Sequence, residues 1–110
     1  MTEIDTFDAT FDYDVIEQSK KIPVIVDFWA SWCGPCLILK PILEKIANEK
    51  EYEKKVVLAK FNVEQNPIKA DEYDIMSIPA VKLFKNGKVV SEFVGARPER
   101  AIKEWIDSNL

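Results

Sequence analysis

The sequence predicts a single α/β domain in which a mixed β-sheet of about five strands is flanked by about four helices. Apolar runs typical of buried strands alternate with segments whose apolar residues recur at helical spacing. Near the end of the chain, Asn86-Gly87 between two β-prone runs predicts a hairpin, and an amphipathic helix follows it. The 110 residues are enough for one buried core, so we expect one domain over residues 1–110.

The first element is expected to be a short strand at residues 4–7. Residues 9–20 then carry apolar side chains on one side of a helical pattern, which predicts a helix. Asp8 and Thr10 precede this segment, and both residue types commonly cap helix N-termini.

Residues 22–28 are apolar except for one aspartate, which is typical of a strand buried on both faces. A helix is expected from about residue 33 to about residue 50. Pro35 fits its first turn, where a backbone N–H has no helical partner. Pro41 lies inside the helix and removes one hydrogen bond, so we expect a kink there.

In the second half of the chain, the same rules predict strands, short helices and one irregular loop. The expected strands are residues 56–63, 80–85 and 88–94; the expected helices are residues 67–73 and a last helix opened by Pro98; the loop is residues 74–79.

Charge and hydropathy exclude several classes of partner. Fifteen basic and nineteen acidic residues give a net charge of −4, with no basic patch, so we expect no nucleic acid and no anionic membrane surface as partner. No apolar run approaches the roughly 20 residues that span a bilayer. The first residues are acidic and lack the apolar core of a signal peptide. We therefore expect a cytoplasmic protein. We also expect it to be a monomer.

The two cysteines, Cys33 and Cys36, are expected to carry the chemistry. Without histidine the chain has no histidine-based triad, and two cysteines fall short of the about four ligands of a structural zinc site. A structural disulfide between them would close a very short loop and constrain the unfolded chain little. Redox exchange is the main interpretation, with no metal and no cofactor. Alternatives are two buried structural cysteines or a zinc site shared between subunits.

Their positions at the start of a helix suggest different roles. Cys33 is expected at the very start of the helix and at its exposed tip, where unpaired N–H groups and the helix dipole favour a thiolate, so we expect it to be the nucleophile. Cys36 lies one turn later on the same side and is expected to resolve the mixed disulfide.

Asp27 is the second candidate catalytic residue. A carboxylate inside an apolar strand should have a raised pKa, which suits a proton acceptor for Cys36. The alternative is that Asp27 points to solvent at the strand end. Lys60 on the neighbouring strand is either a charge partner of Asp27 or an ordinary solvated lysine.

Pro79 is a candidate cis proline that would expose the backbone of the preceding residue to an extended substrate. Trp29 is expected in the core. A small apolar docking surface for substrate is expected from Trp32, Ile75, Ile78 and Gly95.

The run VDFWASWCGPC at residues 26–36 closely resembles the active-site signature of the thioredoxin family. Matches elsewhere extend this resemblance over essentially the whole chain; they are Pro41, Asn66-Pro67, Ile78-Pro79, residues 84–87 and Val94-Gly95. The resemblance implies a thioredoxin fold and a protein-disulfide reductase. It also implies a flavin-dependent thioredoxin reductase, or an equivalent electron donor, and disulfide-containing client proteins.

Carried over residue by residue, the resemblance implies the same cysteine roles and a buried carboxylate at Asp27. It also implies Lys60 as the neighbour of that carboxylate, a Gly34-Pro35 pair between the cysteines, and a cis bond at Pro79.

Four positions depart from the usual pattern of that family. They are Leu37 in place of a common basic residue, Lys40 in place of a small or apolar residue, Met76-Ser77 in the loop before the cis proline, and Ala80 in place of threonine. All lie near the expected docking surface or its support, which suggests a nonstandard reductase or a restricted set of clients.

Three other functions compete with the reductase. The first is an oxidase or isomerase, which Gly34-Pro35 argues against because oxidising relatives commonly carry a histidine between the cysteines. The second is a scaffold that binds a partner through the docking surface without turnover. The third is a glutathione-dependent role, for which the glutaredoxin-like Cys-Pro-Tyr-Cys is absent.

Overall fold

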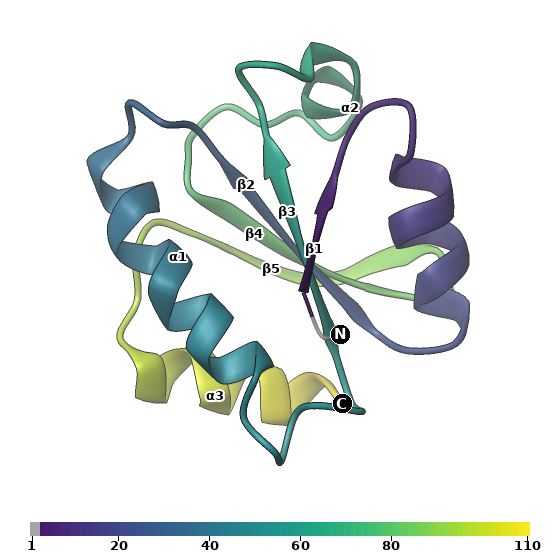
Figure 1. Cartoon of the computed structure of the whole chain (residues 1–110), viewed down its shortest axis with the longest axis vertical. Coiled ribbons are helices and arrows are strands. Elements are labelled where there is room, and N and C mark those ends of the chain that lie inside the picture. The colour runs from purple at the N-terminus through teal and green to yellow at the C-terminus, as the bar shows by residue number, and fades with distance from the viewer. Residues whose placement is uncertain (1–2) are drawn as a thin grey trace.

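A computed structural model describes residues 3–110 and shows a five-stranded mixed sheet in the strand order β1-β3-β2-β4-β5 (Figure 1). The strands are β1 (Glu3–Thr6), β2 (Val24–Trp29), β3 (Val57–Asn62), β4 (Ala80–Lys85) and β5 (Lys88–Val94). The first three are parallel, whereas β4 pairs antiparallel with β2 and β5. The predicted mixed sheet is confirmed. Met1 and Thr2, the start of the acidic segment from which we expected a cytoplasmic location, lie outside the described residues.

Helices cover both faces of the sheet. They are the π-helix η1 (Asp12–Glu17), the 3₁₀-helix η2 (Gln18–Lys20), α1 (Gly34–Ala47), α2 (Pro67–Glu72) and α3 (Glu99–Asn109). Figure 1 shows α1 and α3 together on one side of the sheet and the η1/η2 segment on the other.

The alternation of side chains in β2 separates two cores. Ile25 packs into a cluster with Leu39, Leu43, Ile46 and Ala47 of α1 and with Ile102 and Ile106 of α3. Val24, Val26 and Phe28 pack into a second cluster with Phe11, just before η1. Since successive strand residues point to opposite faces, Asp27 and Trp29 share the α1 face with Ile25. This places the one charged residue of β2 beneath α1.

The segment predicted as one helix over residues 9–20 is instead a π-helix followed by a 3₁₀-turn. Its end is fixed by the hairpin: the Ser19 hydroxyl accepts from the N–H of Gly87 at 2.8 Å, and the Ser19 carbonyl accepts from the N–H of Asn86 at 2.9 Å. A periodic apolar pattern does not distinguish an α-helix from a short π-helix or 3₁₀-helix, because in all three types side chains about one turn apart face the same side.

The hairpin itself has the predicted turn. Asn86 and Gly87 both have positive φ, 52° and 81°, as a two-residue turn of this kind requires. Helix α1 is shorter than predicted at its C-terminal end, and it continues through Pro41. The kink at Pro41 stays a prediction.

The prediction that Asp8 or Thr10 caps the first helix is wrong, since that segment begins without a side-chain cap. The Thr10 hydroxyl accepts from the N–H of Phe7 instead. The Asp8 carboxylate caps a helix far along the chain: it accepts from the N–H groups of Ile68 and Lys69, at 3.1 and 2.8 Å, in the first turn of α2. Asp8 therefore ties the segment after β1 to the segment after β3.

Replacing Asp8 by alanine is expected to lower the free energy of unfolding by about 1 kcal/mol, because two N–H groups of α2 lose their acceptor. Urea unfolding measures this loss. The matched control is Asp71→Ala, which removes an exposed carboxylate from the same helix. Equal losses in the two variants would mean that the capping bonds contribute nothing.

Candidate active site

The two cysteines form a disulfide at the N-terminus of α1, with their Cα atoms 5.2 Å apart. Cys33 is the N-cap residue, in extended conformation, and Cys36 lies in the first turn. The backbone N–H of Cys36 donates to the Cys33 sulfur at 3.2 Å. After reduction this N–H and the helix dipole would stabilise a thiolate at Cys33.

The residues between the cysteines form the first turn of α1. Gly34 opens the helix and Pro35 follows it, and both are exposed. Proline lacks an N–H, and at this point of a helix that group has no intrahelical acceptor to lose. The two cysteines on either side of this exposed pair are themselves buried: Cys33 leaves 5% of its surface exposed and Cys36 none, so Cys33 is not at an exposed tip.

Glu64, in the turn that follows β3, holds the loop before Cys33 through its carboxylate. Glu64 accepts from the backbone N–H of Ser31 at 2.6 Å and from its hydroxyl at 2.8 Å. These two bonds hold the pKa of Glu64 below its ordinary value. Nothing in the sequence pattern pairs residues 33 positions apart, which is why Glu64 is absent from the predicted site.

The loop before β4 lies next to Cys33, the residue predicted to be the nucleophile. The Ile78–Pro79 peptide bond is cis, and the Ile78 carbonyl oxygen lies 3.8 Å from the Cys33 sulfur. Gly95 donates its N–H to the Pro79 carbonyl at 2.8 Å with a φ of +92°, a conformation that favours glycine. The structure thus brings Ile78, Pro79 and Gly95 together beside Cys33.

The other two residues of the expected docking surface lie differently. Trp32, next to Cys33, leaves 71% of its surface exposed. Ile75 packs against the cluster on the η1 face instead of the cysteine cluster, although part of it is exposed. Met76, one of the departures from the family pattern, is 92% exposed.

Asp27 is fully buried under α1, so it does not point to solvent. On the sheet it lies between Lys60 of β3 and Val81 of β4. Among the residues that the structure describes, neither carboxylate oxygen has a hydrogen-bond partner. Burial raises the pKa of Asp27 to about 7; the charges of Lys40 and Lys60 oppose this rise and that of Glu44 adds to it.

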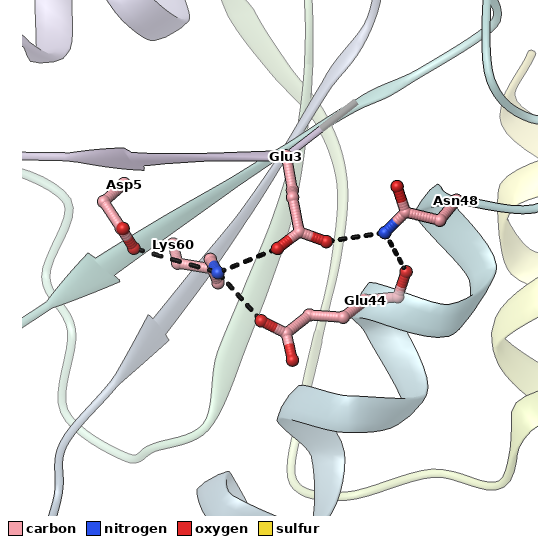
Figure 2. Close-up of polar contacts among 5 residues, drawn as sticks. All are labelled: Glu3, Asp5, Glu44, Asn48 and Lys60. Carbon is pink, nitrogen blue, oxygen red and sulfur yellow. Dashed lines mark hydrogen bonds and ion pairs between the residues drawn. The ribbon is translucent and has the colours of Figure 1, made fainter. Parts of the chain in front are cut away.

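Lys60 is neither a hydrogen-bonded partner of Asp27 nor a solvated lysine. Figure 2 shows its ammonium between carboxylates of two elements, Glu44 of α1 at 2.8 Å and Glu3 of β1 at 3.2 Å. Asp5 lies 3.9 Å away. Burial by itself would lower the pKa of Lys60, but the bonds to Glu44 and Glu3 more than offset this and raise it. Lys60 therefore acts on Asp27 only through its charge.

Lys40 is a charged neighbour of the site that sequence reasoning treated only as a departure from the family pattern. Its ammonium lies 4.5 Å from the centre of the Trp29 ring. Trp29, expected in the core, is half-buried and packs against the cluster that contains both cysteines. The sequence did contain a signal for this position: Cys36 and Lys40 are four residues apart on one helix, and residues so spaced lie on the same face.

Residues 3–110 contain no group of three or more histidine, cysteine, aspartate or glutamate side chains that could hold a metal ion. Within the same described residues, no helix is long and apolar enough to cross a membrane.

Comparisons with known proteins match nearly the whole chain. The sequence model of a family described as "Thioredoxin" matches residues 3–108. The chain is 45% identical over 103 residues to "Thioredoxin" of Chlorobaculum thiosulfatiphilum, which covers 94% of this chain and 92% of that protein. It is 44% identical to "Thioredoxin 1" of Synechococcus elongatus and 46% identical to "Thioredoxin" of Acidithiobacillus ferridurans, with the same coverage.

Proposed function

The chain belongs to the thioredoxin family, and from this we propose how its residues divide the work of thiol–disulfide exchange. It is a thiol–disulfide oxidoreductase that acts as a protein-disulfide reductase. The observation that carries the proposal is the Cys33–Cys36 disulfide at the start of α1. We propose that residues 1–110 act as a single domain.

In the first step, the Cys33 thiolate of the dithiol form attacks one sulfur of a client disulfide. The client S–S bond breaks, a mixed disulfide forms, and the other client sulfur leaves as a thiolate that takes a proton from solvent. The position of Cys33 at the helix N-terminus, with the N–H of Cys36 directed at its sulfur, supports this role.

In the second step, Cys36 gives its proton to Asp27 and attacks the Cys33 sulfur. The bond between Cys33 and the client breaks, the Cys33–Cys36 disulfide forms, and the client leaves with its second sulfur reduced. Two electrons have then passed from the protein to the client. The burial of Asp27, and a pKa of about 7, support its role as proton acceptor near neutral pH.

Client proteins are proposed to dock as extended segments beside Cys33. The support is the grouping of Ile78, Pro79 and Gly95 next to its sulfur, with exposed Trp32 adjacent in the chain. Ile75 would contribute through its exposed part alone. Gly34 and Pro35 would keep the approach to Cys33 open.

Family membership implies a reductase as electron donor and disulfide-containing clients in general. We propose a flavin-dependent thioredoxin reductase or an equivalent enzyme as the donor, a monomeric state, and a cytoplasmic location, where such a donor restores the dithiol. Leu37 and Met76 are exposed and apolar, which supports a restricted choice among reductases or clients.

The direction of exchange is tested by redox equilibrium. Incubated in glutathione buffers of graded ratio and followed by tryptophan fluorescence, the pair is expected to be more reducing than the cytosolic glutathione pool. A pair more oxidising than that pool would contradict a reductase and favour an oxidase or isomerase. The control is the Cys33→Ser/Cys36→Ser variant, whose fluorescence should not follow the buffer ratio; if this double variant retained the cellular role, the protein would be a scaffold.

A further inference from the structure

The buried carboxylate Asp27 has charged groups above and beside it on the α1 face. They are Lys40 and Glu44 on α1 and Lys60 on β3; on β4 its neighbour is the apolar Val81. The proposed function requires Asp27 to be ionised before it can accept a proton from Cys36. Both lysines favour the ionised form, so the one with the larger effect on Asp27 also has the larger effect on catalysis.

Lys60 is the nearer residue along the sheet, but other acids hold its ammonium. Its three carboxylate neighbours are Glu44, Glu3 and Asp5, at 2.8, 3.2 and 3.9 Å. Figure 2 shows this arrangement and shows Asn48 bridging the Glu3 carboxylate and the Glu44 carbonyl. The negative charges around Lys60 offset much of its effect on Asp27.

Lys40 has no acid within ion-pair distance among the residues that the structure describes. Its ammonium is seated on the Trp29 ring at 4.5 Å, within the range of a cation–π contact. Trp29 and Asp27 are two residues apart in β2 and so face the same side, toward α1. The contact with Trp29 therefore holds the ammonium of Lys40 over the sheet face that contains Asp27. Its charge also helps to lower the pKa of Glu3, which lies outside ion-pair distance of Lys40.

We propose that Lys40, more than Lys60, is the positioning residue that favours the carboxylate form of Asp27 and so prepares it to take the proton of Cys36. This inference rests on the proposed role of Asp27 in resolution. Trp29 connects Lys40 with the cysteines: it packs against the cluster that contains Cys33 and Cys36, and the ammonium of Lys40 lies over its ring. Among the charges that favour ionisation of Asp27, Lys40 also has the larger effect on its pKa.

The test is the pH dependence of resolution. The reduced protein is mixed at about pH 4 with a small peptide whose thiol is held in a pyridyl disulfide; Cys33 displaces the pyridinethione and forms the mixed disulfide, while resolution by the protonated Cys36 thiol is slow. The pH is then raised, and release of the peptide thiol is timed. The variants are Lys40→Met, which keeps an apolar stem, Lys40→Arg, which keeps the charge, and Lys60→Met.

The Lys40→Met variant is expected to move the midpoint of the profile upward by about half a pH unit or more and to slow resolution about twofold at pH 7. Lys40→Arg should restore the wild-type midpoint, and Lys60→Met should move it less than Lys40→Met. The matched control is Lys45→Met, also on α1, whose lysine pairs with Glu99 and is 64% exposed. Its midpoint should equal that of the wild type.

Failure of this inference is distinguishable from failure of the proposed function. If Asp27→Asn leaves the rate and its profile unchanged, the role of Asp27 is wrong. If Asp27→Asn slows resolution but Lys40→Met behaves like Lys45→Met, or Lys60→Met shifts the midpoint more, the assignment to Lys40 is overturned. Should Lys40→Met fold poorly, a ¹³C titration of the Asp27 carboxyl in the Lys40→Gln variant decides the same question, since an unchanged titration midpoint would overturn the assignment.

Discussion

Replacing Cys36 by serine is expected to stop turnover and to leave the protein covalently linked to its clients. Cys33 can still attack a client disulfide, but the mixed disulfide has no second thiol within the chain to break it, since the chain has two cysteines. Turnover in a reductase-coupled assay should fall by on the order of a thousandfold or more, as when a covalent reaction loses one of its nucleophiles.

The linked species is measured directly by mass spectrometry under non-reducing conditions. The expected mass is that of the chain plus one client, and a reductant should release the client. The matched variant is Cys33→Ser, which should form no adduct at short times, because Cys36 is fully buried. An adduct through Cys36 in that variant, formed as fast as the one through Cys33, would reverse the two roles.

Replacing Asp27 by asparagine is expected to slow resolution by about tenfold or more at neutral pH and to stabilise the fold at the same pH. The two effects have one cause, the burial of a carboxylate without a hydrogen-bond partner among the described residues. Ionising this buried group costs stability, and in the proposed mechanism the ionised group is the base that accepts the proton of Cys36.

The sign of the stability effect follows from the pKa of Asp27. Burial raises it from 3.8 to about 7 in the folded chain. Below about pH 4 the carboxyl is protonated in both the folded and unfolded chains, so its ionisation does not affect stability. As the pH rises toward 7, only the unfolded chain ionises and the fold loses stability, by up to about 4 kcal/mol above pH 7. Asparagine does not titrate and removes this loss.

Urea unfolding of both proteins between pH 4 and pH 8 measures the effect. The difference in unfolding free energy between Asp27→Asn and wild type should grow by several kcal/mol over this range. The buried amide adds its own cost of about 1–3 kcal/mol, but that cost does not change with pH. A difference that stays constant from pH 4 to pH 8 would show that the pKa of Asp27 is not raised.

Much of the fold was predictable from sequence because it depends on local patterns. The alternation of apolar runs and helical spacing predicts the strands, and the bounds of β4 and β5 agree with the structure residue for residue. Asn86-Gly87 predicts its turn because both residues accept positive φ. The segment at residues 9–20 was predicted less well, because contacts with the distant hairpin determine where its helical turns end.

The cysteine pair was also predictable, since its spacing and its place between strand and helix belong to one continuous run of sequence. The remainder of the site depends on residues far apart in the chain. Examples are Glu64 anchoring Ser31, and Glu3 and Glu44 holding the ammonium of Lys60. Distance along the chain gives no signal for such contacts.

The sequence by itself determined the chemistry, a dithiol at a helix N-terminus and one acid in a buried strand. Only the tertiary structure decided how that acid is tuned. Lys60 is adjacent to Asp27 in register, yet Glu3 and Glu44 engage it, while Lys40 lies on Trp29 above the same face of the sheet. The physical reason is that electrostatic interactions depend on distance and burial in three dimensions, which a linear pattern does not contain.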